Sequence, residues 1–269
     1  MHPDFPAIWH RPPSALDARI DECIRSGCEN ADPLGRVDVF FRADDVAVPG
    51  MQCARLMSLF AKYGAPLSLA IVPAWLTPDR WQYLNGFEKN NPSRWCWHQH
   101  GWRHMNHEAE GKKQEFGDAR SLSEVKQDLI RGKGRLEHLM AEVFYPVFTP
   151  PWNRCSANTL QLLKDLGYAA VSRSRGSKPL STGGLPDFYI NVDLHTRKER
   201  YPVAGWNNLL QEFEQAIASG YCGIMIHHQM MNDAAFDFLE LLLKALIKHT
   251  KIQLVNFKDL VNQKGYCYD

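Results

Sequence analysis

Short apolar runs rich in β-branched and aromatic side chains recur along the chain, a pattern typical of buried strands. Between most of these runs lie longer stretches whose apolar positions recur every three or four residues, as in amphipathic helices. Strands that alternate with helices predict an α/β fold built on a parallel sheet. The expected strands are residues 37–41, 67–72, 95–97, 145–148, 169–172, 188–192, 223–226 and 252–255.

The helical stretches are bounded by capping and stop signals. One helix is expected to be capped by Ser14, with Leu16, Ile20 and Ile24 on its apolar face, and to end near Gly27. The other expected helices cover residues 51–63, 121–144, 156–166, 207–218 and 234–249.

The chain of 269 residues has no repeat, low-complexity stretch or linker, so residues 1–269 are expected to form a single domain. About eight strands in one domain of this size favour a barrel or a distorted barrel. The formal net charge of +1 gives no electrostatic reason to expect nucleic acid or an anionic membrane as a partner. No apolar run is long enough to predict membrane insertion.

The N-terminus lacks the basic start and the apolar stretch of a secretory signal. The 7 cysteines are odd in number, scattered and without a CxxC pair, which favours reduced thiols over a disulfide frame or a cysteine-based zinc site. We therefore expect a cytoplasmic protein. The sequence does not indicate its oligomeric state.

Ionisable side chains follow directly after four of the apolar runs. These clusters are residues 42–45, 98–104, 149–154 and 227–228. Charged groups at the ends of buried strands are costly unless they are paired, solvated or bound to a metal. Functional residues in parallel α/β folds lie at the carboxyl ends of the strands, so the clusters predict a functional site there.

His100 and His104 are separated by four residues. On a helical turn this spacing places both side chains on one face, where two imidazoles can bind one cation. Gly101 allows the tight exit from the strand that such a turn needs. An isolated pair with this spacing is more often a solvated surface. Here the pair directly follows a strand, and an acidic pair follows an earlier one, so we interpret both histidines as metal ligands.

Asp44 and Asp45 would repel each other if both were buried and ionised without a partner. A metal ion that binds one carboxylate leaves the other free as a base. If the strand geometry persists, the two side chains point to opposite sides, which predicts different roles for them. A loop turn is the alternative, but residues 37–41 have the pattern of a buried strand that leads directly into the pair.

These motifs resemble those of the polysaccharide deacetylases, the NodB-homology family also known as carbohydrate esterase family 4. The family has an Asp-Asp pair after the first strand, a His-x-x-x-His pair, a proline-rich third motif and a late strand that ends in histidine. All four occur here in that order, between Asp44 and His228. The resemblance implies a distorted (β/α)7 barrel and a metal-dependent hydrolase that removes an acetyl group from an N-acetylated sugar.

The resemblance also implies roles for individual residues. Asp44 matches the catalytic base, and Asp45, His100 and His104 match the ligands of one divalent metal ion. Zinc is the expected metal, with nickel, cobalt, iron or manganese as alternatives.

His227 matches the histidine that acts as general acid, and His228 is the alternative because strand ends are uncertain by one residue. Asp193 matches a carboxylate that would orient this histidine. Trp152 and Asn153, in the third motif, are expected to form a wall of the substrate pocket.

The sequence departs from the family pattern at two places. Arg42-Ala43-Asp44-Asp45-Val46 stands where the family has Thr-Phe-Asp-Asp-Gly, and Thr149 stands where an arginine usually pairs with the catalytic base. Arg42 and Asp44 share a strand face by the period of two. We therefore hypothesise that Arg42 supplies the missing guanidinium. The alternative is that Arg42 is a surface charge.

Three functions remain open from the sequence. The first is hydrolysis of an acylated sugar, which in a cytoplasmic protein would be small or carrier-linked. The second is a glycan-binding barrel without activity, which the missing third-motif arginine favours. The third is hydrolysis of non-sugar amides on the same scaffold.

Overall fold

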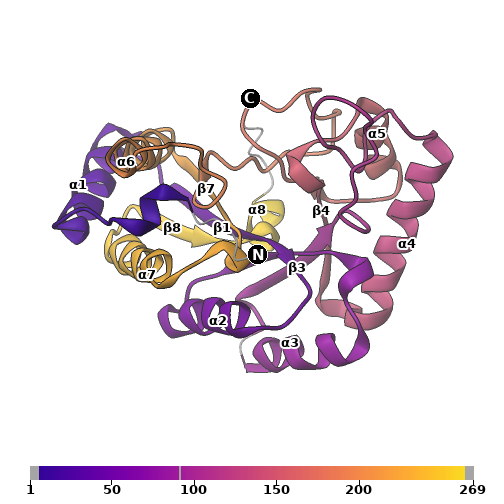
Figure 1. The fold of residues 1–269 in the computed structure, drawn as a ribbon, viewed down its shortest axis with the longest axis horizontal. Coiled ribbons are helices and arrows are strands. Elements are labelled where there is room, and N and C mark those ends of the chain that lie inside the picture. Colours follow the sequence, from indigo (N-terminus) through magenta and orange to yellow (C-terminus); the bar gives the residue numbers. More distant parts are fainter. Residues whose placement is uncertain (1–5, 91, 264–269) are drawn as a thin grey trace. The chain divides into compact units, whose positions relative to one another are not determined.

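The computed structural model describes residues 6–90 and 92–263, and helices alternate with strands along most of the chain (Figure 1). The strands are β1 (Val37–Val46), β2 (Leu67–Ile71), β3 (Trp95–His100), β4 (Phe144–Thr149), β5 (Ala170–Val171), β6 (Val192–Asp193), β7 (Tyr221–Ile226) and β8 (Ile252–Val255). The α-helices are α1 (Leu16–Asn30), α2 (Met51–Tyr63), α3 (Pro78–Asn90), α4 (Leu122–Met140), α5 (Ala157–Asp165), α6 (Pro202–Ala218), α7 (Asp233–Lys248) and α8 (Phe257–Asn262).

The chain forms two compact units that share strand β1. Among the described residues, the first contains 6–43, 50–67 and 191–255. The second contains 44–49, 68–90, 92–190 and 256–263. Strand β1 passes from the first unit into the second between Ala43 and Asp44.

In the first unit the strands run in the order β6-β7-β1-β8, and each neighbouring pair is parallel. Helices α1 and α6 pack against each other, and Gly27 makes this approach possible. A Cβ at Gly27 would lie 2.8 Å from the Ile217 Cβ atom. Three rings fill the core of the unit: Trp9, Trp206 and Phe238 have centroids 5.3 to 5.4 Å apart. Burial of such large apolar side chains is the main stabilising contribution.

The strands of the second unit run in the order β2-β3-β4-β5, and β3-β4 and β4-β5 are parallel. The end of β1 joins them, because the Val72 N–H donates to the Val46 carbonyl at 3.0 Å. Helices α4 and α5 pack together over a core that includes Leu129, Phe148 and Leu163. The carboxyl ends of β1, β3 and β4, which carry three of the predicted polar clusters, thus belong to this unit.

The fold class is therefore α/β with parallel strands, as in a distorted (β/α)7 barrel, and this prediction is confirmed. Helix α2 has the predicted bounds and ends at Gly64, whose φ of 66° suits glycine. The cap predicted at Ser14 is wrong, because Ala15 is the N-cap of α1 and the helix continues to Asn30. The strand predicted over 188–192 is also wrong, since regular pairing begins only at Val192. Helices α3 and α8 were not predicted.

Six cysteines lie in the described residues, and all of them are free thiols in buried positions. Burial raises the pKa of Cys53 to about 11 and that of Cys96 to about 12, so both stay protonated near neutral pH. The expectation of reduced thiols is confirmed for these six residues, and Cys267 lies outside the described part of the chain. None of the described helices has both the length and the apolar character needed to cross a bilayer.

Candidate metal centre

Asp45, His100 and His104 meet in the second unit. The Asp45 Oδ1 atom lies 3.3 Å from His100 Nε2 and 3.2 Å from His104 Nε2. The three ligand atoms all lie within 4.8 Å of one another. Among the described residues, this is the group of His, Cys, Asp or Glu side chains that is placed to hold a metal ion. One carboxylate oxygen and two imidazole nitrogens are a ligand set that suits zinc and related divalent ions. Convergence of these three side chains is the central feature of the site.

The main-chain carbonyl of Thr149 determines which nitrogen of His100 faces Asp45. His100 Nδ1 lies 2.9 Å from this oxygen, which can only accept, so Nδ1 carries the proton. In the neutral ring Nε2 then presents a lone pair to the Asp45 carboxylate. Two lone pairs at this separation need a cation between them, either a proton or a metal ion. The hydrogen bond from His100 Nδ1 to the Thr149 carbonyl is of the kind that metal-binding histidines usually make with their second nitrogen.

The two histidines differ in their affinity for a proton. Burial lowers the pKa of His100, but the hydrogen bond to Asp45 and the charges of Asp44 and Asp45 outweigh it, so the net pKa is raised. Burial and the neighbouring His100 lower the pKa of His104. Both rings lie beside the Asp45 carboxylate, whose negative charge favours a cation at this place. A divalent ion fits this arrangement, because it satisfies both nitrogens at once.

The chain reaches His104 by a loop, so the predicted helical turn between the histidines is wrong. His100 is the last residue of β3, and residues 101–107 have no helical structure. Gly101 makes the exit from the strand with φ of 59°, as expected from its sequence position. A Cβ there would lie 2.2 Å from Glu115 Oε2, so a side chain at this position is excluded.

Glu115 holds this loop and was not identified from the sequence. Its side chain is buried, and its carboxylate accepts three consecutive main-chain N–H groups. Arg103 N lies 2.7 Å from Oε1, and Trp102 N and His104 N each lie 3.2 Å from Oε2. The carboxylate thus takes the place of the carbonyls that would bind these groups in a helix.

Several residues of the site have left-handed backbone. The non-glycine residues with positive φ in the described chain include Asp45 at 58°, His104 at 59°, Trp152 at 56° and Asn153 at 60°. Such conformations are uncommon outside glycine and cost about 1–3 kcal/mol each, and they cluster at functional sites. At Asp45 the turn ends the strand geometry. The sequence-based expectation that the side chains of Asp44 and Asp45 simply alternate across a strand therefore does not apply.

The third motif lies beside the ligands. The ring centroids of Trp152 and His104 are 4.5 Å apart, and Trp75 lies on His104 at 5.9 Å. Thr149, which stands at the position of the family's arginine, has its hydroxyl 2.9 Å from the Nε2 atom of His98. Asp44 is buried, with 3% of its surface exposed. Trp152 therefore contacts the candidate ligand His104. Thr149 contacts both histidines of β3, His98 through its hydroxyl and His100 through its carbonyl.

The other predicted residues belong to the first unit. Arg42 is fully buried in β1, with its Nη2 3.2 Å from the Met225 sulfur, so the interpretation of a surface charge is wrong. His227 follows β7 directly and its N–H donates to His195 Nδ1 at 3.2 Å. His228 is buried in the short turn after it.

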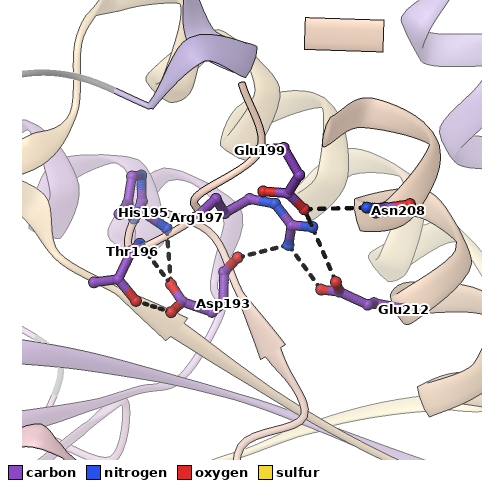
Figure 2. A network of polar contacts seen from close by, with 7 residues as sticks. All are labelled: Asp193, His195, Thr196, Arg197, Glu199, Asn208 and Glu212. Carbon is purple, nitrogen blue, oxygen red and sulfur yellow. Dashed lines mark hydrogen bonds and ion pairs between the residues drawn. The ribbon is translucent and has the colours of Figure 1, made fainter. Parts of the chain in front are cut away.

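Asp193 is bound by its own loop. Figure 2 shows its carboxylate accepting the N–H groups of His195 and Thr196, both at 2.9 Å, and the Thr196 hydroxyl. Arg197 extends the network, since it pairs with Glu199 and Glu212. Asp193 therefore stabilises the turn after β6. Its predicted role in orienting His227 stays a prediction.

No protein-family model and no curated protein matches the chain, but its fold is found in solved structures. A protein from Mycobacterium smegmatis assigned to the polysaccharide deacetylases has a TM-score of 0.65 at 12% identity, over 86% of this chain and 91% of that one. An allantoinase has a TM-score of 0.59 at 12% identity, over 87% and 92%. A family 4 carbohydrate esterase pseudoenzyme from Bacillus anthracis has 0.54 at 11%, over 86% and 66%. The chain has the fold of the polysaccharide deacetylases.

Proposed function

We propose that this protein is a metal-dependent hydrolase that removes the acetyl group from an N-acetylated sugar, cleaving a C–N bond that is not a peptide bond. The observation that carries the proposal is the convergence of Asp45, His100 and His104. Asp44, the proposed base, directly precedes Asp45 in the chain. Residues 1–269 would act as one catalytic domain on a small or carrier-linked substrate in the cytoplasm. Zinc is the metal that we expect, given the oxygen and nitrogen ligands.

Each residue of the site has a distinct part in the proposed reaction. Asp45, His100 and His104 would hold the ion, which supplies Lewis-acid chemistry toward water and the amide carbonyl. Asp44 would take a proton from the attacking water as its oxygen bonds to the carbonyl carbon. His227 would give a proton to the amine nitrogen as the C–N bond breaks, leaving acetate and a free amine. The part of His227, like that of His228 as its alternative, comes from the family resemblance.

Trp152 and Asn153 are proposed to face the sugar. The indole of Trp152 is half-buried and lies against His104, so it offers an apolar surface next to the ligands. Sugar rings have apolar faces of C–H groups that pack on such surfaces. The left-handed backbone at both residues fixes the direction of the two side chains.

Release of acetate tests the proposed function directly. The zinc-loaded protein is expected to release acetate from an N-acetylated hexosamine, and Asp44→Asn to lower the rate by about 100- to 10,000-fold, the usual contribution of a general base. Zinc content should stay unchanged in this variant. Asp118→Asn, at an exposed position in the same unit, is the matched control. Bound zinc without release from any acylated sugar or simple amide would contradict hydrolysis.

Two alternatives have specific support. The likeness to an allantoinase favours a non-sugar amide as the substrate, and the same release assay on simple and cyclic amides separates this case. The likeness to a pseudoenzyme, together with Thr149 at the position of the family's arginine, favours glycan binding without turnover. The presence of Asp44 favours hydrolysis over binding alone, because a binding protein does not need a base beside its metal ligands.

Arg42 is proposed to compensate for the absent arginine. A buried guanidinium requires an acceptor of opposite charge, and Asp44 lies two residues further along β1. The Arg42→Met variant keeps most of the side-chain volume without the charge, and its kcat is expected to fall by about 100-fold. Arg36→Met, at an exposed position just before the same strand, serves as the control. Undiminished turnover in a folded, zinc-loaded Arg42→Met protein would end this hypothesis.

A further inference from the structure

A basic hollow lies beside the candidate metal centre in the second unit. It has a volume of about 430 Å³ and is lined by three segments that follow β3, β4 and β5. Its lining residues are Lys112, Gln114, Trp152, Asn153, Arg154, Ser174, Arg175, Gly176, Ser177 and Lys178. Four of them are cations and none is acidic, although the chain as a whole has a formal net charge of only +1. The positive charge is therefore local, and it attracts anions to this place.

The hollow and the candidate metal centre share one side chain. Trp152 lines the hollow, and its ring lies 4.5 Å from the ring of His104. A ligand that lies on Trp152 can therefore reach the metal ligands with one end and the basic residues with the other.

The segments that carry the cations have defined backbone contacts. The loop with Lys112 is closed by the His107 N–H, which donates to the Gln114 carbonyl at 3.0 Å, and Glu115 anchors it next to Gln114. The Arg175 N–H donates to the Ile190 carbonyl at 2.8 Å. The basic side chains thus project from an ordered frame, which is the arrangement that binds an anion in a fixed place.

Arg154 is one of the four cations of the lining, and its Nη1 donates to the Lys113 carbonyl at 3.4 Å. It is half-buried and follows directly after Trp152 and Asn153, whose backbone is held in the left-handed region. A guanidinium presents parallel N–H donors that match the two oxygens of a carboxylate or phosphate. Asn153, Ser174 and Ser177 add neutral hydrogen-bonding groups to the lining. The lining has the composition of a binding site for an anionic oxygen group.

We infer that the substrate carries an anionic group, a phosphate or a carboxylate, which binds in the basic hollow while its acyl group lies at Asp45, His100 and His104. This inference depends on the proposed function, since it names the class of substrate for the same site. The anionic group would fix the position of the acyl group and increase the affinity, without taking part in the cleavage of the C–N bond.

The test compares three acylated sugars that differ only in the substituent at carbon 5 or 6 of the sugar: N-acetylglucosamine, its 6-phosphate and the corresponding 6-carboxylate. Binding is measured by calorimetry and acetate release is measured separately, on the zinc-loaded protein. The wild type is expected to bind at least one of the anionic sugars about tenfold more tightly than the neutral one, equivalent to about 1.4 kcal/mol. The 6-phosphate and the 6-carboxylate show which group is preferred.

Variants locate the effect in the hollow. The double substitution Arg154→Gln/Arg175→Gln is expected to reduce the ratio of anionic-sugar to neutral-sugar affinity to less than about threefold. Lys126→Gln, on the exposed face of α4, should retain the full preference. Equal binding of charged and neutral sugars by the wild type, or a preference that survives the double substitution, overturns the inference.

Failure of the anionic-substrate inference and failure of the proposed hydrolysis would give different results. Rapid release of acetate from the neutral sugar with no anionic preference would support the proposed function and overturn the inference. An anionic preference that depends on Arg154 and Arg175, without acetate release from any compound, would establish the binding site and contradict the proposed hydrolysis.

Discussion

The Asp45→Asn variant is expected to lose the high-affinity binding of one zinc ion per chain, with the dissociation constant raised by more than about 100-fold. Changes outside the ligand shell already cost about 10- to 100-fold in affinity, so loss of a ligand should cost more. Asparagine is the suitable replacement because it tolerates the left-handed backbone at this position, where φ is 58°. Its neutral amide oxygen is a much weaker ligand than the carboxylate.

Zinc content after dialysis and competition with a chelator measure this effect. Zinc should also raise the thermal midpoint of the wild type but not that of the variant, because an ion that binds only the folded state stabilises it. His100→Ala should behave like Asp45→Asn, whereas Asp118→Asn should behave like the wild type. An Asp45→Asn protein that retains one tightly bound zinc ion would contradict the assigned ligand set.

Glu115→Ala is expected to reduce zinc affinity by about 10- to 100-fold and the free energy of unfolding by about 1–3 kcal/mol. The substitution leaves the N–H groups of Trp102, Arg103 and His104 without their acceptor. The loop then no longer holds the His104 backbone in the conformation that places its imidazole next to Asp45. Glu115 does not touch the ligand atoms, so it acts as a positioning residue.

The Glu115→Gln variant separates positioning from general stability. Glutamine keeps one oxygen that can accept from Arg103, but its amide group donates and cannot accept from the other two N–H groups. We expect this variant to regain only part of the stability and part of the zinc affinity, between Glu115→Ala and the wild type. Glu110→Ala, at an exposed position in the same loop, is the control. Wild-type zinc affinity in folded Glu115→Ala would contradict the positioning role.

Much of the fold could be predicted because its signals are local. Helix α2 has an apolar stripe and a glycine stop, and both ends were predicted correctly. The apolar run at 37–41 predicted β1, although the strand continues to Val46 through the polar residues of the site. Helix α3 was not predicted because its apolar residues have little periodicity. The failed Ser14 cap shows that a serine before a helix is not by itself a cap.

The convergence of the three candidate ligands could be predicted, but not the contacts that support it. Asp45, His100 and His104 were identifiable because the residue types that can bind a metal are few, and because all three lie at or shortly after the end of a strand. Glu115 has no such signal, since a glutamate in a polar loop is usually solvated and its buried contacts are to main-chain atoms. The role of the Thr149 carbonyl could not be predicted either, because it is a main-chain group that every residue has. The left-handed backbone at Asp45 and His104 could not be predicted because neither position is a glycine.

The partner of His100 has a consequence for how this chain can diverge. Every residue at position 149 carries a carbonyl, so mutation of that codon replaces the side chain without deleting the acceptor. The orientation of the imidazole therefore depends on the register of the strand at position 149, and exchange of arginine for threonine there keeps this acceptor. The contact of the Thr149 hydroxyl with His98, by contrast, depends on the side chain.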